Sequence, residues 1–231
     1  MKKIISSLLL AIAFMLTSLA TSASDKTDAE KFVLDSAETL TNFANDPDMK
    51  WFRDHIKTAK GILIVPSLLK AGFIFGGSGG TGVMLRNNAV TSAWSNEPVK
   101  QWSAPAFYTM GSVTWGLQIG AEKAEVVLLI MTDKGMDAML STKFQLGADA
   151  SVAAGPVGAG TQAATADVLQ FSRSKGIFGG LTLEGSVLNP RENLNGAYYG
   201  NSASPLDILV KGSYSNAQAN DLRAKLATLS K

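Results

Sequence analysis

The order of predicted elements places this chain of 231 residues in the α+β class. We expect a single domain whose N-terminal and C-terminal helices pack on a twisted antiparallel β-sheet. The sequence does not decide whether this sheet also curls into a barrel-like shape. Helical periodicity occurs near both ends of the chain, and alternating apolar and polar residues fill the middle. No linker divides the chain. Because helices and strands do not alternate, a parallel β-α-β sheet is not expected.

The first 23 residues have the composition of a secretory signal peptide. Two lysines precede an uncharged apolar run over residues 4–16, and small residues follow it. Cleavage after Ala20 or after Ala23 fits equally well. The run is shorter than the roughly 20 residues that span a bilayer. We therefore interpret residues 1–23 as a cleaved leader and 24–231 as the mature domain, exported to the periplasm and peripherally associated with a membrane.

Composition excludes several classes of function. The formal net charge is +2, and removal of the leader, which carries two lysines and no acidic residue, makes the mature chain nearly neutral. Overall charge therefore gives no argument for nucleic acid as a partner. The chain contains no cysteine, so neither a disulfide framework nor a thiol-linked lipid anchor is expected.

Two helices are predicted to open the mature chain. Thr27 and Glu30 form a capping box, and apolar residues then recur at helical spacing: Val33, Ala37, Leu40 and Phe43. Asp46 is the predicted N-cap of a second helix, with Pro47 at its first position and its end near Lys60.

The middle of the chain reads as strands and the end as helix. Strands are expected over 62–65, 73–75, 111–120, 126–131, 144–152, 167–172 and 177–188, with a hairpin-like turn at Lys123. A short helix is predicted over 133–140, capped by Thr132 or Asp133. The tail carries a C-terminal amphipathic helix whose apolar positions are Ala219, Leu222, Leu226 and Leu229.

Residues 77–82, Gly-Ser-Gly-Gly-Thr-Gly, match the dinucleotide fingerprint G-x-G-x-x-G. The motif binds a pyrophosphate only where it follows a strand and opens a helix. Residues 83–88 are too short and too β-like for that helix, and no lysine follows at the spacing of a phosphate loop. We therefore interpret the glycines as a flexible hairpin loop between two strands.

No catalytic constellation is recognisable. His55 is the only histidine, which excludes multi-histidine zinc sites and two-histidine iron sites. Its neighbours Asp46, Asp48 and Asp54 suit helix caps and surface charges better than a carboxylate pair. We therefore predict neither an enzyme nor a cofactor or metal.

The second predicted helix carries two stripes. Its apolar stripe is Met49, Phe52, Ile56 and Ala59, and the adjoining basic stripe is Lys50, Arg53, Lys57 and Lys60. Such a helix can lie on an anionic membrane surface, with Trp51 at the interface. The candidate membrane-contacting residues are Lys50, Trp51, Phe52, Arg53 and Ile56. The alternative is an ordinary surface helix that packs its apolar face on a core and leaves its lysines in water.

Several blocks resemble the SYLF-domain family. They are Ala59–Pro66, Lys70–Phe73 with the Gly-rich stretch, Trp102–Tyr108, Gly116–Ala121, Phe171–Leu181, Leu183–Gly185 and Tyr198–Gly200, and the ordered similarity covers about residues 28–230. The resemblance implies a lipid-binding module: eukaryotic members bind phosphoinositides, some bind actin filaments, and bacterial members are commonly exported. For an exported chain it implies affinity for anionic phospholipid headgroups.

Phosphate binding requires cationic side chains near exposed backbone N–H groups. The candidate headgroup ligands lie at segment ends: Lys57, Lys60, Lys70, Arg173 and Lys175. The predicted function is non-enzymatic binding of anionic phospholipid headgroups at a membrane surface of the cell envelope. Two alternatives stay open, an envelope protein–protein interaction module, whose partner could also be a second copy, and a small outer-membrane β-barrel.

Overall fold

The computed structural model describes residues 2–72, 75–91, 98–115, 120–155, 165–174, 177–178 and 183–231. Only the backbone is described for residues 2–23, 72, 75, 89–91, 98–100, 114–115, 120 and 177–178. Among the described residues no helix combines the length and the apolar character that crossing a bilayer requires. The candidate Lys175 lies outside the described residues.

The first helix, α1, spans Lys2–Asn45 as one element. The helix start predicted at Thr27 is therefore wrong for the full chain, because no Gly or Pro between residues 4 and 44 interrupts the helix. Its predicted apolar stripe is confirmed, since all four members are buried: Val33, Ala37, Leu40 and Phe43. The removal of residues 1–23 stays a prediction.

A capped turn leads from α1 into the second helix, as predicted. The Asp46 carboxylate accepts the backbone N–H of Asp48 at 2.9 Å and caps η1 (Pro47–Met49). The helix α2 spans Lys50–Ile56, which is shorter than the predicted helix to Lys60.

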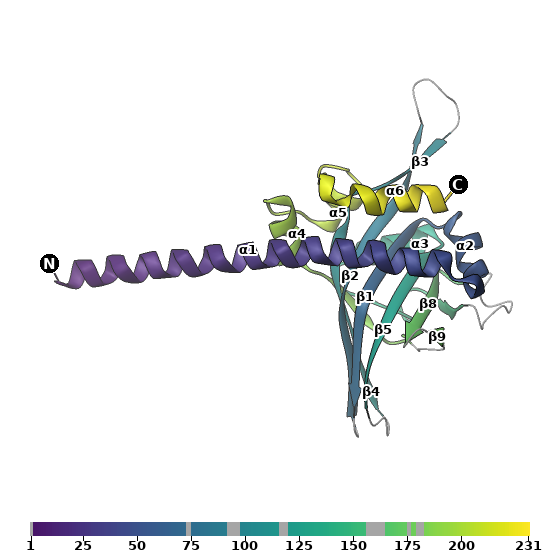
Figure 1. The fold of residues 1–231 in the computed structure, drawn as a ribbon, viewed down its shortest axis with the longest axis horizontal. Helices are drawn as coiled ribbons and strands as arrows, with labels where there is room; N and C mark the ends of the chain where they lie inside the picture. Colours follow the sequence, from purple (N-terminus) through teal and green to yellow (C-terminus); the bar gives the residue numbers. More distant parts are fainter. Residues whose placement is uncertain are drawn as a thin grey trace.

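Ten strands form the sheet in the described part of the chain (Figure 1). Their order is β6-β10-β4-β2-β1-β5-β8-β7, with β3 paired to β2 and β9 to β8. The bounds are β1 Gly61–Gly72, β2 Phe75–Thr91, β3 Pro98–Trp102, β4 Ala106–Trp115, β5 Gly120–Ile130, β6 Phe144–Gln145, β7 Val152–Ala154, β8 Val168–Ser174, β9 Ile177–Phe178 and β10 Val187–Pro190. The α+β prediction is confirmed. The sheet is mixed, because β7 and β8 run parallel.

Hydrophobic clusters cover both faces of the sheet near its centre. On one face α1, α2, α4 (Glu192–Tyr199) and α6 (Asn220–Leu229) pack around residues such as Ile62 and Phe171. On the other face α3 (Asp133–Met139), α5 (Pro205–Leu209) and β6 surround Leu63 and Tyr108. Helices α3 and α6 were predicted, whereas α4, α5 and the short η3 (Ala217–Ala219) were not.

The Gly-rich stretch lies inside β2 and is no loop, so the hairpin interpretation is wrong. Each of its residues from Gly76 to Gly82 pairs with β4, and β1 pairs on the other side. A Cβ on Gly80 would lie 2.7 Å from the Ser67 carbonyl oxygen, and one on Gly82 would lie 2.8 Å from a Leu63 methyl group. These glycines therefore let β1 pack closely against β2.

A β-bulge in β1 determines which residues face the helices. The pairing of β1 with both neighbours shifts between Val65 and Leu68, where Pro66 and Ser67 lie. One extra residue in a strand reverses the alternation beyond it. Ile62 and Ile64 face α1 before the bulge, and Leu69 lies on that same face after it.

Candidate functional site

The structure separates the predicted headgroup ligands. Lys57 and Lys60 lie between α2 and the start of β1, where the Lys60 ammonium pairs with the Asp133 carboxylate at 3.3 Å. Lys70 lies ten residues further along β1, which corresponds to roughly 30 Å of strand. No single site can therefore contain both Lys60 and Lys70.

The apolar stripe of α2 belongs to the core. Phe52 and Ile56 are fully buried, so their assignment as membrane-contacting side chains is wrong for this structure. Trp51 lies against Phe171, with ring centroids 5.6 Å apart. Arg53 donates to the Ala44 carbonyl oxygen at 3.2 Å and so caps the end of α1.

Lys50, the remaining residue of the predicted membrane-contacting set, is exposed and pairs with Asp54 on the next turn of α2 at 2.5 Å. The Lys50 ammonium also holds the pKa of the Asp54 carboxyl below its ordinary value. The helix α2 thus fits the alternative interpretation of an ordinary surface helix better than that of a membrane-binding helix.

Arg173 holds the end of α1 against the sheet. Its guanidinium pairs with Glu125 of β5, with one N–H···O contact at 2.7 Å. The same carboxylate accepts the Thr39 hydroxyl at 3.0 Å. A groove of about 520 Å³ lies beside this pair, lined by Pro66, residues 121–125 and Arg173. Because Arg173 already has an anionic partner, it is a poor candidate for a phosphate ligand.

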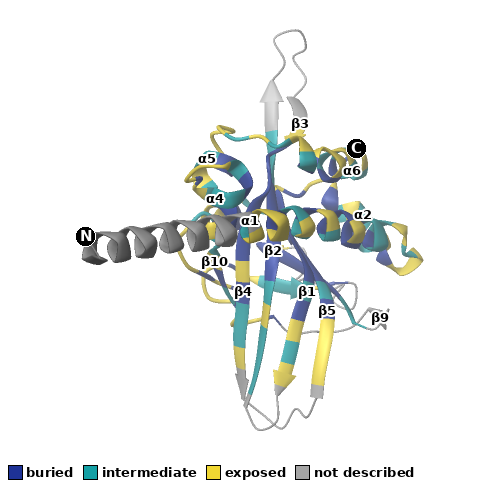
Figure 2. Cartoon of the chain, turned by 60° about the vertical axis from the view of Figure 1, so that its left-hand side comes forward, coloured by how far each residue is buried: buried dark blue, intermediate teal, exposed yellow. Residues whose placement is uncertain are grey.

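The four central strands continue past the helices as a projecting sheet (Figures 1 and 2). We call this part the distal sheet and define it by the residues whose side chains are described: 69–71 of β1, 76–80 of β2, 111–113 of β4 and 121–123 of β5. Its strands run in the order β4-β2-β1-β5. In Figure 2 it is coloured mostly as intermediate or exposed.

One face of the distal sheet, on the side of α1, is made mainly of small residues. Glu125 contacts α1, so Lys123, two residues before it in β5, lies on the same face. Pairing then fixes two rows across the four strands. The rows are Val113-Gly77-Ala71-Ala121 and Gly111-Gly79-Leu69-Lys123. We call these eight residues the helix-side face.

Two large apolar side chains of this face are open to solvent: Leu69 is 60% exposed and Val113 is 79% exposed. Lys123 is also exposed, and it lies opposite Leu69 in the pairing of β1 with β5. Among the described residues, no ion pair involves Lys123 or Lys70. The helix-side face therefore combines exposed apolar groups with a cation.

The opposite face of the distal sheet is polar. Its row across the strands is Ser112-Ser78-Lys70-Glu122. The hydroxyls of Ser78 and Ser112 are 2.8 Å apart, and Glu122 accepts a hydrogen bond from Ser174. The distal sheet is therefore amphipathic, with small and apolar residues on one face and hydroxyl and charged groups on the other.

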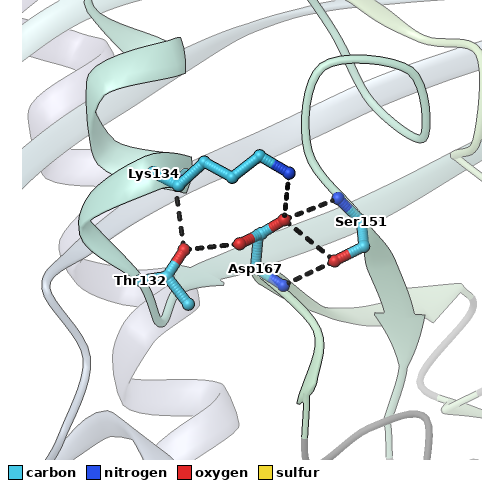
Figure 3. A network of polar contacts seen from close by, with 5 residues as sticks. Thr132, Lys134, Ser151 and Asp167 are labelled. Carbon is cyan, nitrogen blue, oxygen red and sulfur yellow. Dashed lines mark hydrogen bonds and ion pairs between the residues drawn. The ribbon is translucent and has the colours of Figure 1, made fainter.

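A network around Asp167 is the best-formed polar cluster in the described residues (Figure 3). Its carboxylate accepts the Thr132 hydroxyl at 2.6 Å and the Ser151 hydroxyl at 2.9 Å, and Lys134 is 3.3 Å away. Burial opposes its ionisation, but these hydrogen bonds outweigh burial and hold the pKa of Asp167 at about 2.

This network has a structural role. It joins the start of α3 to the strands β7 and β8, and its carboxylate oxygens are already occupied by protein donors. An anionic carboxylate with so low a pKa is a poor general acid or base near neutral pH. Within the described residues no cluster of three or more His, Cys, Asp or Glu residues could bind a metal ion.

Sequence reasoning missed the residues that make the helix-side face distinctive. Lys123 was assigned to a turn, although it lies inside β5. Val113 was placed correctly in an alternating strand, but neither its exposure nor the face of Leu69 could be derived. The bulge at Pro66 sets the orientation of Leu69, and a proline within an apolar run is the signal that could have indicated it.

Comparison with known proteins places this fold in a family. Residues 111–229 match the model of the family Ysc84, described as "Las17-binding protein actin regulator". The human SH3 domain-containing YSC84-like protein 1 is 30% identical over 208 residues, which is 85% of this chain and 57% of the relative.

Yeast relatives match over a shorter part. LAS seventeen-binding protein 3 of Saccharomyces cerevisiae is 32% identical over 164 residues, covering 68% of this chain and 34% of the relative. Protein YSC84 of the same organism is 31% identical over 162 residues, or 67% and 32%. The chain thus spans between a third and three-fifths of the length of these relatives, one of which is named as a binding protein. The chain belongs to the Ysc84 (SYLF) family.

Proposed function

We propose that this protein binds anionic phospholipid at a membrane surface, without catalysis, and that the distal sheet makes the contact. One observation carries the proposal: the projecting sheet exposes Leu69 and Val113 on a face that also presents Lys123. Membrane-surface proteins combine buried apolar area with cations that meet lipid phosphates. A lysine near an anionic leaflet contributes about 1 kcal/mol.

The proposed headgroup ligands are Lys123 and Lys70. Both lie in the distal sheet, and neither forms an ion pair within the described residues. Lys57 and Lys60, proposed from the sequence, lie before the start of β1, with Lys60 roughly 30 Å from Lys70 along the strand, and they represent a second, separate location. Export to the periplasm by the leader peptide is part of the proposal, since the membrane would then be one of the cell envelope.

Vesicle co-sedimentation tests this function. The protein is mixed with vesicles of phosphatidylcholine alone or with increasing fractions of phosphatidylglycerol, at low and high salt. We expect binding to rise with the anionic fraction and to fall with salt, because the surface potential acts over a Debye length of about 10 Å at 0.1 M ionic strength. Equal sedimentation with neutral and anionic vesicles, or none with either, would refute the proposal.

The family description favours a protein partner as a second candidate function. Its words "actin regulator" concern relatives that are longer than this chain. If that property extends to this domain, the protein should sediment with purified actin filaments in the absence of lipid. Sedimentation with filaments that is unaffected by the charge reversal of Lys70 and Lys123 would assign that activity to another surface.

A further inference from the structure

We infer that the helix-side face of the distal sheet enters the interfacial layer of the bilayer, with Val113 deeper than Leu69. This inference rests on the proposed function and extends it, because it specifies which face meets lipid and how far it penetrates. The occupant of this face is the headgroup and upper acyl region of an anionic membrane.

The composition of the helix-side face suits insertion. Five of its eight positions are Gly or Ala: Gly77, Gly79, Gly111, Ala71 and Ala121. Such residues keep the surface flat, so Leu69 and Val113 are the groups that project from it. Among the described residues, five large apolar side chains are substantially exposed, and two of those five belong to this face.

Charge distinguishes the two faces of the distal sheet. The helix-side face contains Lys123 and no acidic residue, whereas on the opposite face Lys70 lies directly across from Glu122. A lysine beside an apolar patch can bury its methylene stem and leave its ammonium among lipid phosphates. The helix-side face is therefore complementary to an anionic bilayer, whereas the opposite face suits water and the headgroup layer, where the Lys70 ammonium meets lipid phosphates.

Backbone pairing limits the depth of insertion. The two inner strands, β1 and β2, pair on both sides across the distal sheet. Among described residues, β4 beyond Gly111 and β5 before Ala124 have no outer neighbour. Their unpaired N–H and C=O groups require water or headgroups, so we expect a shallow insertion.

The position of α1 sets the tilt of the distal sheet relative to the membrane surface. The row of Leu69 lies one row away from the contact between Glu125 and Thr39, and the row of Val113 lies one row further out. Adjacent rows on one face are about 6.6 Å apart. Because α1 stands above the same face, a flat membrane can reach the outer row more closely than the inner one.

A second copy of the chain is a less suitable occupant. Four strands about 4.8 Å apart and two rows about 6.6 Å deep give an area of roughly 250 Å². Stable protein interfaces bury about 800 Å² on each partner. A bilayer needs no such area, because the attraction of lysines to the anionic surface adds to apolar burial.

The absence of cysteine from the sequence permits a clean test with single-cysteine variants. Val113→Cys and Ser112→Cys place an environment-sensitive nitrobenzoxadiazole (NBD) label on opposite faces at adjacent positions of β4. With vesicles of equal phosphatidylcholine and phosphatidylglycerol, we expect the label at position 113 to shift to the blue and its emission to rise severalfold. The label at position 112 should keep its aqueous spectrum, and one at position 69 should shift less than at 113.

The outcomes separate this inference from the proposed function. If the protein sediments with anionic vesicles while labels at 113 and 112 respond equally or not at all, the face assignment is wrong and lipid binding stands. If the protein does not sediment, both fail. A blue shift at 113 that appears with rising protein concentration in the absence of lipid would show that a second copy covers the face, and would also overturn the inference.

Unlabelled variants give an independent measurement. Combining Leu69→Ser with Val113→Ser should lower the affinity for anionic vesicles about tenfold or more, since each exposed side chain loses its apolar burial. Leu34→Ser is the matched control, because Leu34 is 59% exposed on α1 and lies outside the distal sheet. Equal losses in the control and the double variant, with circular dichroism unchanged, would contradict the inference.

Discussion

The glycines of β2 offer a sharp test of the fold, because Gly80 is tightly packed whereas its neighbour Gly79 is open. A Cβ on Gly80 would lie 2.7 Å from the Ser67 carbonyl oxygen and 2.9 Å from a Val65 methyl group, whereas one on Gly79 would meet nothing within 4 Å. Overpacking of this kind costs about 1–3 kcal/mol, and the Ser67 contact is with backbone, which cannot rotate away. An alanine in a strand interior is otherwise favoured over glycine by about 0.5–1 kcal/mol.

Gly80→Ala should therefore lower the free energy of unfolding by about 1–2 kcal/mol, while Gly79→Ala should leave it unchanged or raise it slightly. For a chain of this length a loss of 2 kcal/mol corresponds to a fall of roughly 4–8 °C in Tm. Urea unfolding followed by circular dichroism measures both variants. If the two alanine variants are equally stable, these glycines do not pack against the bulge of β1, and the assignment of residues 76–82 to a strand is wrong.

Two further predictions concern buried polar contacts. The pKa of Asp167 is held at about 2, below its ordinary value of 3.8, so its ionised form stabilises the fold by about 2 kcal/mol. Asp167→Asn should lose that contribution at pH 7, and the difference in unfolding free energy from the parent protein should shrink as the pH falls from 4 toward 2. The control Asp133→Asn, which changes an exposed pair, should have little effect. If urea titrations give a difference for Asp167→Asn that does not depend on pH, the assignment is contradicted. Asn195 is fully buried and accepts the Phe107 backbone N–H at 2.8 Å, so Asn195→Ala should destabilise the protein by about 1–3 kcal/mol. The control Asn193→Ala, at a neighbouring exposed residue, should lower Tm by no more than about a degree or two. Equal Tm values of the two variants in thermal melts would show that the contact is unimportant.

Local signals in the sequence predicted many of the elements. The N-cap at Asp46 and the apolar spacing of α1 and α6 depend on contacts between residues close in the chain, and all are present. The helix α4 was missed because Gly196 and several polar residues weaken its helical pattern. Its stability comes from tertiary contacts such as that of Asn195 with Phe107.

The candidate site depends on long-range pairing that the sequence does not encode locally. Which face Leu69 occupies depends on one additional residue near Pro66. Without that bulge, alternation would place Lys70 on the side of Ile62 and Ile64. The exposure of Val113 depends on where the covering helices end. For Phe52 the sequence allowed either membrane contact or burial in a core, and the packing of α2 against Phe171 decides for burial.

A comparison of two charge reversals tests our claim that the distal sheet carries the membrane contact. One variant combines Lys70→Glu with Lys123→Glu, and its control combines Lys57→Glu with Lys60→Glu at the other end of β1. At about 1 kcal/mol per lysine near an anionic leaflet, reversal of the distal pair should lower the affinity for phosphatidylglycerol-containing vesicles at least tenfold. We expect the control to lose less than about threefold, with both variants folded by circular dichroism. An equal or greater loss in the control, or full binding by the distal variant, would contradict the claim.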